Sequence, residues 1–269
     1  MSIKYAFIGS GSMARAMIGG IVTSGLAAPD CVIAANPSAP KLDALKKDFV
    51  IQIIQKDNAA AAAQADVVIL SVKPHLYETV IAEIKTVIRP ETIVVMIAAG
   101  QTIAANEARF GKPVKLARVM PNTPALVGEA MSAVCFNAEM SDADQAVVLA
   151  MLRSFGKAEI VPERMMDTVT GVSGSSPAYV YLFIEAMADA AVLHGMPRAQ
   201  AYTFAAQSVL GAAKMVLETG THPGALKDAV CSPGGTTIEA VATLERSGMR
   251  AAVIDAIDAC IKKSQAMSN

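Results

Sequence analysis

Residues 1–160 alternate continuous runs of β-branched and other apolar residues with Ala-rich stretches of helical period. Runs that are apolar at every position are typical of strands buried on both faces of a parallel sheet. Strands that alternate with helices along the chain favour an α/β fold with a doubly wound sheet. The predicted strands are 4–9, 31–36, 49–54, 66–72, 92–97 and 114–120, with 131–136 as an added edge strand.

The β-branched runs stop after Pro162, and only helical patterns follow. We therefore place a domain boundary near 162, between an α/β domain over 1–161 and an all-α domain over 162–269. The helices predicted in the second domain are 163–170, 176–194, 197–219, 224–230, 236–247 and 249–266.

Hydrophobic residues make up 53% of the chain, and much of the excess over an ordinary protein lies in the second domain. Helices there are apolar around more than one face, which requires burial on two sides. We therefore expect a homo-oligomer formed through this domain. An Ala-rich helical core within one chain is the alternative.

Charge and targeting patterns exclude several partners. The chain carries 23 Lys and Arg residues against 24 Asp and Glu residues without a basic block, so we expect no nucleic-acid surface. The apolar stretch 178–193 carries Glu185 and Asp189 and is shorter than the roughly 20 residues of a membrane span, so we expect no membrane partner. The opening MSIKYAFIG lacks the pattern of a signal peptide. We expect a cytoplasmic protein.

Metal and disulfide chemistry has no support in the sequence. The four cysteines, at 31, 135, 231 and 260, lie far apart and lack the paired spacing of a zinc site or a disulfide framework. His75, His194 and His222 have no carboxylate partner in a catalytic pattern, and no nucleophile elbow occurs. We expect no metal.

A glycine-rich turn joins the first predicted strand to the first helix. Gly9, Gly11 and Ala14 form G-x-G-x-x-A in the position of the dinucleotide fingerprint. Gly9 would make the tight turn, Gly11 would let the backbone approach a pyrophosphate, and Ala14 would let the helix pack closely on the strand. The phosphates would sit on the free amides of the helix start. The first domain is therefore predicted to be a Rossmann-like dinucleotide-binding domain.

The end of the second predicted strand indicates which dinucleotide is bound. An NAD site has Asp or Glu there to accept the ribose 2′-hydroxyl, but this strand ends in Asn36, followed by Ser38 and Lys41. These side chains can donate to a 2′-phosphate, and Asn58 at the head of the next helix is a second candidate donor. Asn36-Pro37-Ser38 also fits a turn and Asn58 a helix cap, and both interpretations can hold together. We predict NADPH as the preferred cofactor and NADH as the second candidate.

Polar segments follow three later strands, where ligands bind in such sheets. They are SVKP at 71–74, IAAG at 97–100 and RVMPNTP at 118–124. Lys73 is either a functional residue or a solvated strand end. Asn122 and Thr123 supply the polarity of the last loop, which we expect near the nicotinamide ring.

A dinucleotide enzyme needs a second surface for its substrate, and two breaks in the helical domain qualify. In 171–181, GVSGSSPAYVY, a Ser-rich turn opens a long apolar helix with Pro177 in its first turn. In 232–240, SPGGTTIEA, two glycines precede Thr236 and Thr237. Both breaks would present backbone amides at a helix start, which bind a small anion such as a carboxylate. The alternative for each is a helix–helix corner with ordinary capping.

Nearly the whole chain resembles the pyrroline-5-carboxylate reductase family, in particular its bacterial members. The resemblance rests on FIGSGSMA, SVKP, RVMPNTPALV, GVSGSSPAYVY, MPRAQAY and HPGALKDAVCSPGGTTIEA, in that order, and the last is the most specific. It implies an NAD(P)H-dependent oxidoreductase that reduces the C=N bond of 1-pyrroline-5-carboxylate to L-proline, the last step of proline biosynthesis. It also implies a homodimer that pairs through intertwined C-terminal helices, and larger rings of dimers.

The resemblance assigns roles to residues of both predicted domains. Thr237 matches the family threonine that hydrogen-bonds the substrate and is the catalytic candidate. It would orient the substrate, because a hydroxyl is a poor proton donor. The rest of the substrate pocket would comprise Ser173, Gly174, Ser175, Ser176, Val230, Gly234, Gly235 and Thr236. The dinucleotide site would comprise Ile8, Gly9, Ser10, Gly11, Ser12, Met13, Asn36, Asn58, Ser71, Val72, Lys73, Pro74, Ile97, Ala98 and Ala99.

Two positions depart from the pattern of some relatives, which carry Ser where Asn36 stands and Asn where Ala229 stands. Asn36 can still donate to a phosphate, whereas Ala229 offers no polar side chain. The sequence therefore constrains cofactor preference less than it constrains the reaction.

Two other functions are compatible with the residues. A β-hydroxyacid dehydrogenase also pairs a nucleotide domain with helices and uses a catalytic lysine, for which Lys214 and Lys227 are candidates. A nucleotide-sensing protein without turnover would bind NADPH that no imine oxidises.

Overall fold

The structure is a computed structural model, and it describes residues 2–268. Contacts between residues divide the chain into two compact units. Unit 1 comprises the chain up to Ser175 together with the residues from Cys260 onward, and unit 2 is Ser176–Ala259. Unit 1 thus extends past the boundary expected near 162, and the functional ranges 1–161 and 162–269 stay predictions.

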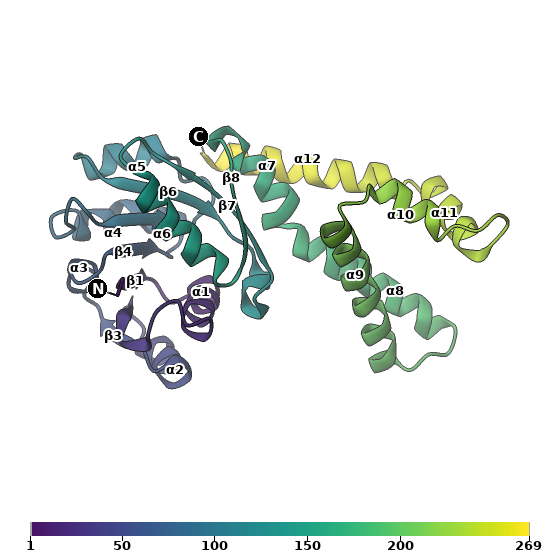
Figure 1. Cartoon of the computed structure of the whole chain (residues 1–269), viewed down its shortest axis with the longest axis horizontal. Helices are drawn as coiled ribbons and strands as arrows, with labels where there is room; N and C mark the ends of the chain where they lie inside the picture. The colour runs from purple at the N-terminus through teal and green to yellow at the C-terminus, as the bar shows by residue number, and fades with distance from the viewer. Residues whose placement is uncertain (1, 269) are drawn as a thin grey trace. The chain divides into compact units, whose positions relative to one another are not determined.

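One sheet forms the centre of unit 1 (Figure 1). Its strands are β1 Tyr5–Ile8, β2 Val32–Asn36, β3 Gln52–Gln55, β4 Val67–Leu70, β5 Ile93–Met96, β6 Lys115–Met120, β7 Ala130–Phe136 and β8 Gly156–Ile160. The strand order is β3-β2-β1-β4-β5-β6-β7-β8, and β1 to β6 pair in parallel. The order 3-2-1-4-5-6 is that of a dinucleotide-binding sheet, which confirms the Rossmann-like fold.

The last two strands correct the prediction of the sheet edge. β7 was expected at an edge, but it pairs antiparallel with β6 and parallel with β8, so β8 is the edge strand. No strand was predicted at β8, because Ala158 is its one buried residue and no apolar run marks it. Gly156 begins β8 with a φ of +154°, and a Cβ there would collide with the backbone of Ala130. The close pairing of β7 with β8 therefore requires glycine.

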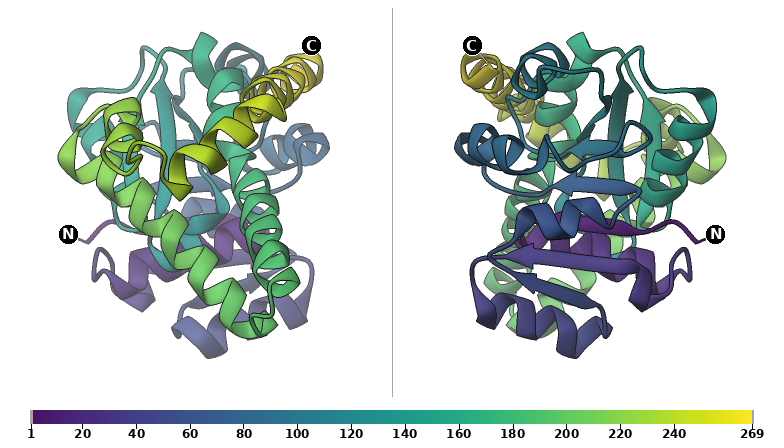
Figure 2. Two further views of the ribbon diagram at one scale, coloured as in Figure 1. Left: turned by 90° about the vertical axis from the view of Figure 1, so that its right-hand side faces the viewer. Right: turned by 90° about the vertical axis from the view of Figure 1, so that its left-hand side faces the viewer.

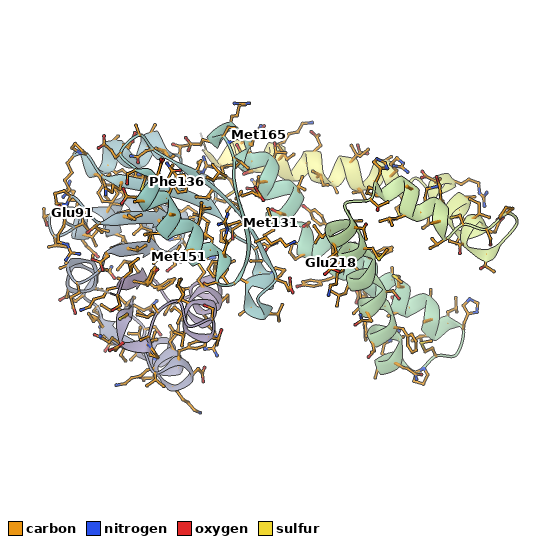
Figure 3. The ribbon with its side chains drawn as sticks, viewed as in Figure 1. Glu91, Met131, Phe136, Met151, Met165 and Glu218 are labelled. Carbon is orange, nitrogen blue, oxygen red and sulfur yellow. The ribbon has the colours of Figure 1, made fainter. Side chains whose placement is uncertain are left out.

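Helices cover both faces of this sheet. They are α1 Ser12–Thr23, α2 Ala39–Phe49, α3 Asn58–Ala63, α4 Tyr77–Ile84, α5 Ile103–Phe110 and α6 Asp142–Arg153. Tyr5 and Phe7 of β1 pack in a cluster with α1, α2 and α6, whereas Ala6 and Ile8 pack in a second cluster with α3, α4 and α5. Met151 of α6 is fully buried in the first cluster (Figure 3). Alternate residues of one strand thus serve two cores, as expected for a doubly wound sheet.

The chain after the sheet is helical up to Gly174, bends at Ser175 and continues as a new helix from Ser176. Glu163–Met165 forms a 3₁₀ turn, α7 spans Met166–Val169, and Thr170–Gly174 is a π-helix. The amide of Ser175 donates to the carbonyl of Thr170 at 2.9 Å, the i→i−5 bond of that helix type. The new helix thus begins at Ser176, where a helix start was predicted, but a π-helix and a bend at Ser175 replace the predicted Ser-rich turn.

Unit 2 consists of helices. They are α8 Ser176–Leu193, α9 Arg198–Thr219, α10 Pro223–Ala229, α11 Thr236–Arg246 and the first part of α12 Met249–Ser268. α8 and α9 pack against each other (Figure 2). The buried residues of this unit are Ala188, Ala201 and Ala205, whereas Leu193 is 82% exposed and Leu182 is 68% exposed. The helices therefore leave most of their apolar side chains uncovered within one chain.

Apolar surface of this kind also bears on the question of a membrane. The helical stretch Glu163–Leu193, of mean hydropathy 1.2, is long and apolar enough to cross a bilayer by length and composition alone. Core and interface helices of other proteins pass the same test. The absence of a membrane partner stays a prediction.

The end of α12 returns to unit 1. Cys260 Sγ donates to Ser175 Oγ at 3.3 Å, and Ser264 Oγ donates to Asp167 Oδ1 at 2.6 Å. Gly100 has a φ of +73°, and a Cβ there would lie 2.8 Å from the carbonyl oxygen of Met267. Unit 1 is therefore assembled from two separate stretches of the chain.

Candidate active site

The turn after β1 has the geometry predicted for Gly9. Its φ is +103°, and a Cβ would lie 2.5 Å from the carbonyl oxygen of Ser71, so only glycine fits. Its amide donates to the carbonyl of Ala35 at 2.8 Å, while Ser71 Oγ lies 2.8 Å from the Gly9 carbonyl and 3.0 Å from that of Ile8. The turn is thus fixed to the ends of β2 and β4.

The start of α1 fits an anion. Gly11 is the N-cap residue, and no side chain caps the helix, so its first amides have no partner within the described chain. A Cβ on Gly11 would meet nothing within 4 Å, which leaves open space beside these amides. Ser10 Oγ is buried and has no hydrogen-bond partner among the described residues. Ala14 is fully buried against the sheet. These residues suit the pyrophosphate of a dinucleotide.

The ends of β4 and β5 lie beside this turn. The segments 71–74 and 97–99 follow these neighbouring strands, so both are at the same sheet edge as Gly9. Tyr77 joins them, because its hydroxyl donates to the carbonyl of Leu70 at 2.9 Å and accepts from the amide of Ala98 at 3.2 Å. Burial raises the pKa of Tyr77 above its usual value of 10, which keeps the hydroxyl protonated. Tyr77 was not predicted as a site residue, since a Tyr within a helical stretch carries no signal for this bridge.

Asn36 at the end of β2 is arranged as a donor. Its Oδ1 accepts from the amide of Ser38 at 2.8 Å, which leaves Nδ2 as the atom available to a ligand. The predicted turn is therefore compatible with the predicted donor, and the donor role of Asn36 stays a prediction. Lys41 is exposed in the first turn of α2. Lys73 is also exposed and makes no side-chain hydrogen bond to another described residue.

Asn58 differs from the prediction of a helix cap. Asp57 caps α3 instead, since its Oδ1 accepts from the amide of Ala60 at 2.8 Å. Asn58 Nδ2 donates to Glu83 Oε2 at 2.7 Å. Asp57 is the cap because it directly precedes the first residue of the helix. At that position a carboxylate accepts hydrogen bonds from helix amides and complements the helix dipole.

The start of α11 in unit 2 presents free amides, as predicted for 232–240. Gly234 has a φ of +67°, Gly235 is the N-cap residue, and no side chain caps the helix. Thr236 is exposed and Thr237 half-buried, and neither hydroxyl bonds another described residue. Gly234, Gly235 and Thr236 line an open groove of about 1000 Å³ together with Phe183, Ala186, Met187 and Ala190 of α8 and with Glu239, Ala240, Thr243 and Leu244 of α11. Val230 lies outside that lining and is 64% exposed.

The segment Ser173–Ser176 is held through its backbone by the loop between β6 and β7. Asn122 Nδ2 donates to the carbonyl of Ser173 at 3.0 Å, and Asn122 Oδ1 accepts from the amide of Met131 at 2.9 Å. Pro177 has no N–H, so the Ser173 carbonyl lacks its usual helix donor, and Asn122 supplies one from the β6–β7 loop. The polar atoms of Asn122 therefore serve the fold. Two hydroxyls of the segment also have partners within the chain, since Ser173 Oγ donates to the carbonyl of Val169 at 3.2 Å and Ser175 Oγ accepts from Cys260.

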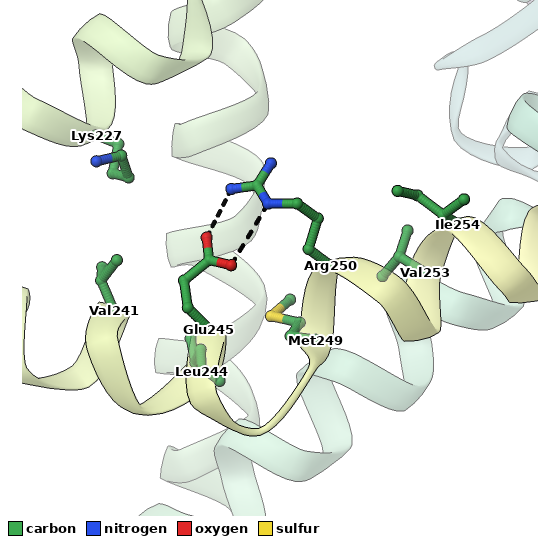
Figure 4. Close-up of a pocket in the computed structure, with 8 residues that line it drawn as sticks. All are labelled: Lys227, Val241, Leu244, Glu245, Met249, Arg250, Val253 and Ile254. Carbon is green, nitrogen blue, oxygen red and sulfur yellow. Dashed lines mark hydrogen bonds and ion pairs between the residues drawn. The ribbon is translucent and has the colours of Figure 1, made fainter.

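The two lysines considered for a hydroxyacid dehydrogenase lie in ordinary ion pairs. Lys214 Nζ is 3.4 Å from Glu218 one turn along α9, and Lys227 Nζ is 2.6 Å from Asp228. The hydrogen bond to Asp228 raises the pKa of Lys227, which keeps it charged rather than poised to exchange a proton. Lys227 lines a second pocket of unit 2, of about 500 Å³, with Val241, Leu244, Met249, Val253, Ile254 and the paired Glu245 and Arg250 (Figure 4).

The histidines and cysteines show no catalytic or metal-binding arrangement. His222 Nδ1 caps α10 by accepting from the amide of Gly224 at 3.0 Å. Within the described chain, His, Cys, Asp and Glu side chains form no group of three or more that could hold a metal ion.

Two family models match the chain. One, for pyrroline-5-carboxylate reductase dimerisation, matches residues 163–267, and the other, for coenzyme F420-dependent NADP oxidoreductases, matches residues 4–100. The pyrroline-5-carboxylate reductase of Escherichia coli strain K12 is 52% identical over 273 residues, which cover 100% of this chain and 99% of the relative.

Solved structures agree with these matches. A pyrroline-5-carboxylate reductase from Coxiella burnetii has a TM-score of 0.93 at 33% identity, with 100% of both chains covered. The Plasmodium falciparum pyrroline carboxylate reductase with NADP bound has a TM-score of 0.90 at 32% identity, with 99% of this chain and 98% of that chain covered. Identity of this extent along the whole chain shows that it belongs to the pyrroline-5-carboxylate reductase family.

Proposed function

We propose that this chain is an NAD(P)H-dependent oxidoreductase that reduces the C=N bond of 1-pyrroline-5-carboxylate to L-proline, the last step of proline biosynthesis. The observation that carries the proposal is the end-to-end match to a reductase at 52% identity. Because this match spans both units, the glycine turn after β1 and the start of α11 both have counterparts in a protein of that activity.

Residues 1–161 form the dinucleotide domain in this proposal. The turn over Ile8–Met13 and the free amides of α1 hold the pyrophosphate, which suits a helix N-terminus. The segments 71–74 and 97–99, joined through Tyr77, contact the rest of the cofactor from the ends of β4 and β5. When bound, NADPH supplies the hydride that adds to C5 of the ring.

Residues 162–269 bind the substrate and pair the subunits. The amides of Thr236 and Thr237 bind the substrate carboxylate, since they open α11 without a capping side chain. The Thr237 hydroxyl orients the ring. Val230 and the segment Ser173–Ser176 complete the pocket.

The chemistry places modest demands on these side chains. As the hydride adds to C5, the π electrons of the C=N bond move to nitrogen, which carries the proton of the iminium form into the product amine. The segment 232–238 contains no residue that titrates near neutral pH. Thr237 therefore acts by orientation, because a hydroxyl is a poor acid at this pH.

The cofactor preference follows from the end of β2. Asn36 stands where an NAD enzyme carries a carboxylate, and its free Nδ2 can donate to a phosphate. We propose that NADPH is preferred over NADH.

We propose that the chain forms a homodimer through its C-terminal helices, and that dimers build a larger ring. The exposed leucines of α8 and α9 and the apolar pocket between α11 and α12 support pairing through unit 2 (Figure 4). We further propose a cytoplasmic enzyme without a nucleic-acid or membrane partner. The balanced charge of the chain supports the first of these absences.

The reaction is tested by adding 1-pyrroline-5-carboxylate to enzyme with NADPH, and separately with NADH, while the near-ultraviolet absorbance of the reduced cofactor is followed. We expect oxidation of the cofactor, proline as the product and a faster reaction with NADPH. Tight NADPH binding without oxidation would favour a nucleotide-sensing protein. No oxidation of either NADPH or NADH would overturn the proposal.

A further inference from the structure

The nucleotide domain contains two asparagines whose amide groups are fixed in opposite senses. At the end of β2, Oδ1 of Asn36 accepts from the amide of Ser38 at 2.8 Å, so Nδ2 is the atom left for a ligand. At the start of α3, Nδ2 of Asn58 donates to Oε2 of Glu83 at 2.7 Å, so Oδ1 is the atom left. One asparagine thus offers a donor and the other an acceptor.

Asn58 and Glu83 line a pocket of about 470 Å³ together with Pro37, Lys56, Asp57 and Ala59. Lys56 contributes one positive charge to the lining, and Asp57 and Glu83 contribute two negative charges. The lining therefore carries one net negative charge. Lys56 holds a φ of +58°, which is unfavourable for a residue with a side chain and is typical of functional loops. A phosphate dianion is repelled by such a lining, whereas a neutral donor pairs with Oδ1 of Asn58.

We propose that Glu83 is a specificity-determining residue of the nucleotide site. By holding the amide nitrogen of Asn58, it makes this pocket accept a neutral hydrogen-bond donor of the adenosine, a ribose hydroxyl or the exocyclic amine. The 2′-phosphate is thereby directed to the Asn36 side, where Nδ2 and the exposed Lys41 are free to meet it. This inference rests on the proposed function, because it requires a dinucleotide in unit 1.

Replacement of Glu83 changes two properties of the pocket at once. Glu83→Ala releases Nδ2 of Asn58, which can then turn toward a phosphate, and it removes one negative charge. Glu78→Ala is the matched control, because Glu78 lies exposed on the same helix and makes no side-chain hydrogen bond to another described residue. It removes the same charge without releasing Asn58.

The experiment is isothermal titration of the full-length enzyme with NADP⁺ and with NAD⁺, which measures binding without turnover. We expect Glu83→Ala to raise the affinity for NADP⁺ relative to NAD⁺ by about three- to tenfold, the range of one typical net hydrogen bond. Glu78→Ala should leave the ratio within error of the unmodified enzyme. An unchanged ratio in Glu83→Ala, or an equal change in both variants, would overturn the proposal.

A double-mutant cycle separates the freed amide from the lost charge. Asn58→Ala alone should weaken NADP⁺ and NAD⁺ by similar factors, because the acceptor meets a group that both share. In the Asn58→Ala background, Glu83→Ala should no longer raise the ratio. If the gain persists there, charge alone sets the preference and the role assigned to Asn58 is wrong.

Failure of this inference is distinguishable from failure of the proposed function. An enzyme that reduces the imine with NADPH but shows no response to Glu83→Ala contradicts only the inference. A protein that binds neither dinucleotide contradicts both.

Discussion

Unit 1 and unit 2 bury apolar side chains in opposite ways. In unit 1, the two faces of the sheet each carry a closed core, with Phe7 and Ile8 as fully buried neighbours that point to different cores. In unit 2, the buried residues are three alanines, and the large apolar side chains of α8 and α9 are mostly exposed. Unit 1 thus contains what it needs to be stable, whereas unit 2 requires a partner surface. One chain can therefore carry a domain with its own closed cores beside a domain whose apolar surface is covered only by assembly.

The largest expected effect is on assembly. Phe204 of α9 is 59% exposed in unit 2, and Phe204→Glu would place a charge on the apolar surface that is proposed to pair subunits. We expect the variant to elute as a smaller species by size-exclusion chromatography with light scattering. Val127→Glu is the control, because Val127 is 76% exposed in unit 1. An unchanged mass for Phe204→Glu, or dissociation of both variants, would remove the contrast between the units.

The next effect concerns the stability of unit 1. Gly9→Ala forces a Cβ into a backbone with φ of +103° and against the Ser71 carbonyl, which should cost about 3 kcal/mol and abolish dinucleotide binding. Gly25→Ala is the matched variant, since Gly25 has a φ of +74° but open space around it, and about 1 kcal/mol is expected there. Urea unfolding measures the free energy of unfolding of both variants, and titration with NADPH measures their binding of the dinucleotide. Equal losses would show that the contact with Ser71 contributes nothing.

A smaller effect is expected in the helical half. Thr237→Ala removes a hydroxyl that bonds no other described residue, so the folded chain should be unaffected. We expect kcat to fall about tenfold or more, as for loss of one hydrogen bond, with the Kd for NADPH unchanged. Thr237→Ser should restore most of the rate. A raised Kd with an intact kcat would place Thr237 in the nucleotide site instead.

The smallest expected effect is a fall in the free energy of unfolding at alkaline pH, which arises from Cys135 in unit 1. Burial, followed by the charge of Glu163, raises the pKa of the Cys135 thiol from 9.0 to about 12. Above pH 9 the unfolded chain loses this proton while the folded chain keeps it, so the free energy of unfolding should fall as pH rises from 9 toward 12. Cys135→Ala should flatten this fall, whereas Cys231→Ala, at a half-buried site in unit 2, should not. Parallel slopes for both variants would contradict the assignment.

Much of the fold was predictable, because burial on both faces leaves a mark in the residues. β1 to β6 appeared as continuous apolar runs, and the glycine turn after β1 predicted the nucleotide site. β8 left no such mark, since Ala158 is its one buried residue and its place depends on pairing with β7. α6 was also not predicted, although the capping box of Ser141 and Asp144 is a signal for its start.

The site was predictable where a single residue determines the backbone conformation. It was less predictable where several residues could supply the same hydrogen bond. Gly9 and Gly235 behave as expected from local conformation. The Ser-rich segment before Pro177 suggested a turn, but the carbonyl that Pro177 leaves unpaired is satisfied by Asn122, a partner distant in sequence. The cap of α3 depends on Asp57 rather than Asn58, and the bridge made by Tyr77 depends on the carbonyl of Leu70 at the end of β4. Such contacts form only in the folded chain, so local sequence patterns do not predict them.

The return of α12 to unit 1 has a consequence for synthesis of the chain. The bonds of Cys260 to Ser175 and of Ser264 to Asp167 join residues that leave the ribosome far apart in time. All strands of the sheet precede α7 in the chain, whereas the partners of Asp167 and Ser175 lie at the end of α12 and are synthesised last. The apolar helices of unit 2 are synthesised before the end of α12, and apolar surface that is exposed during folding favours aggregation.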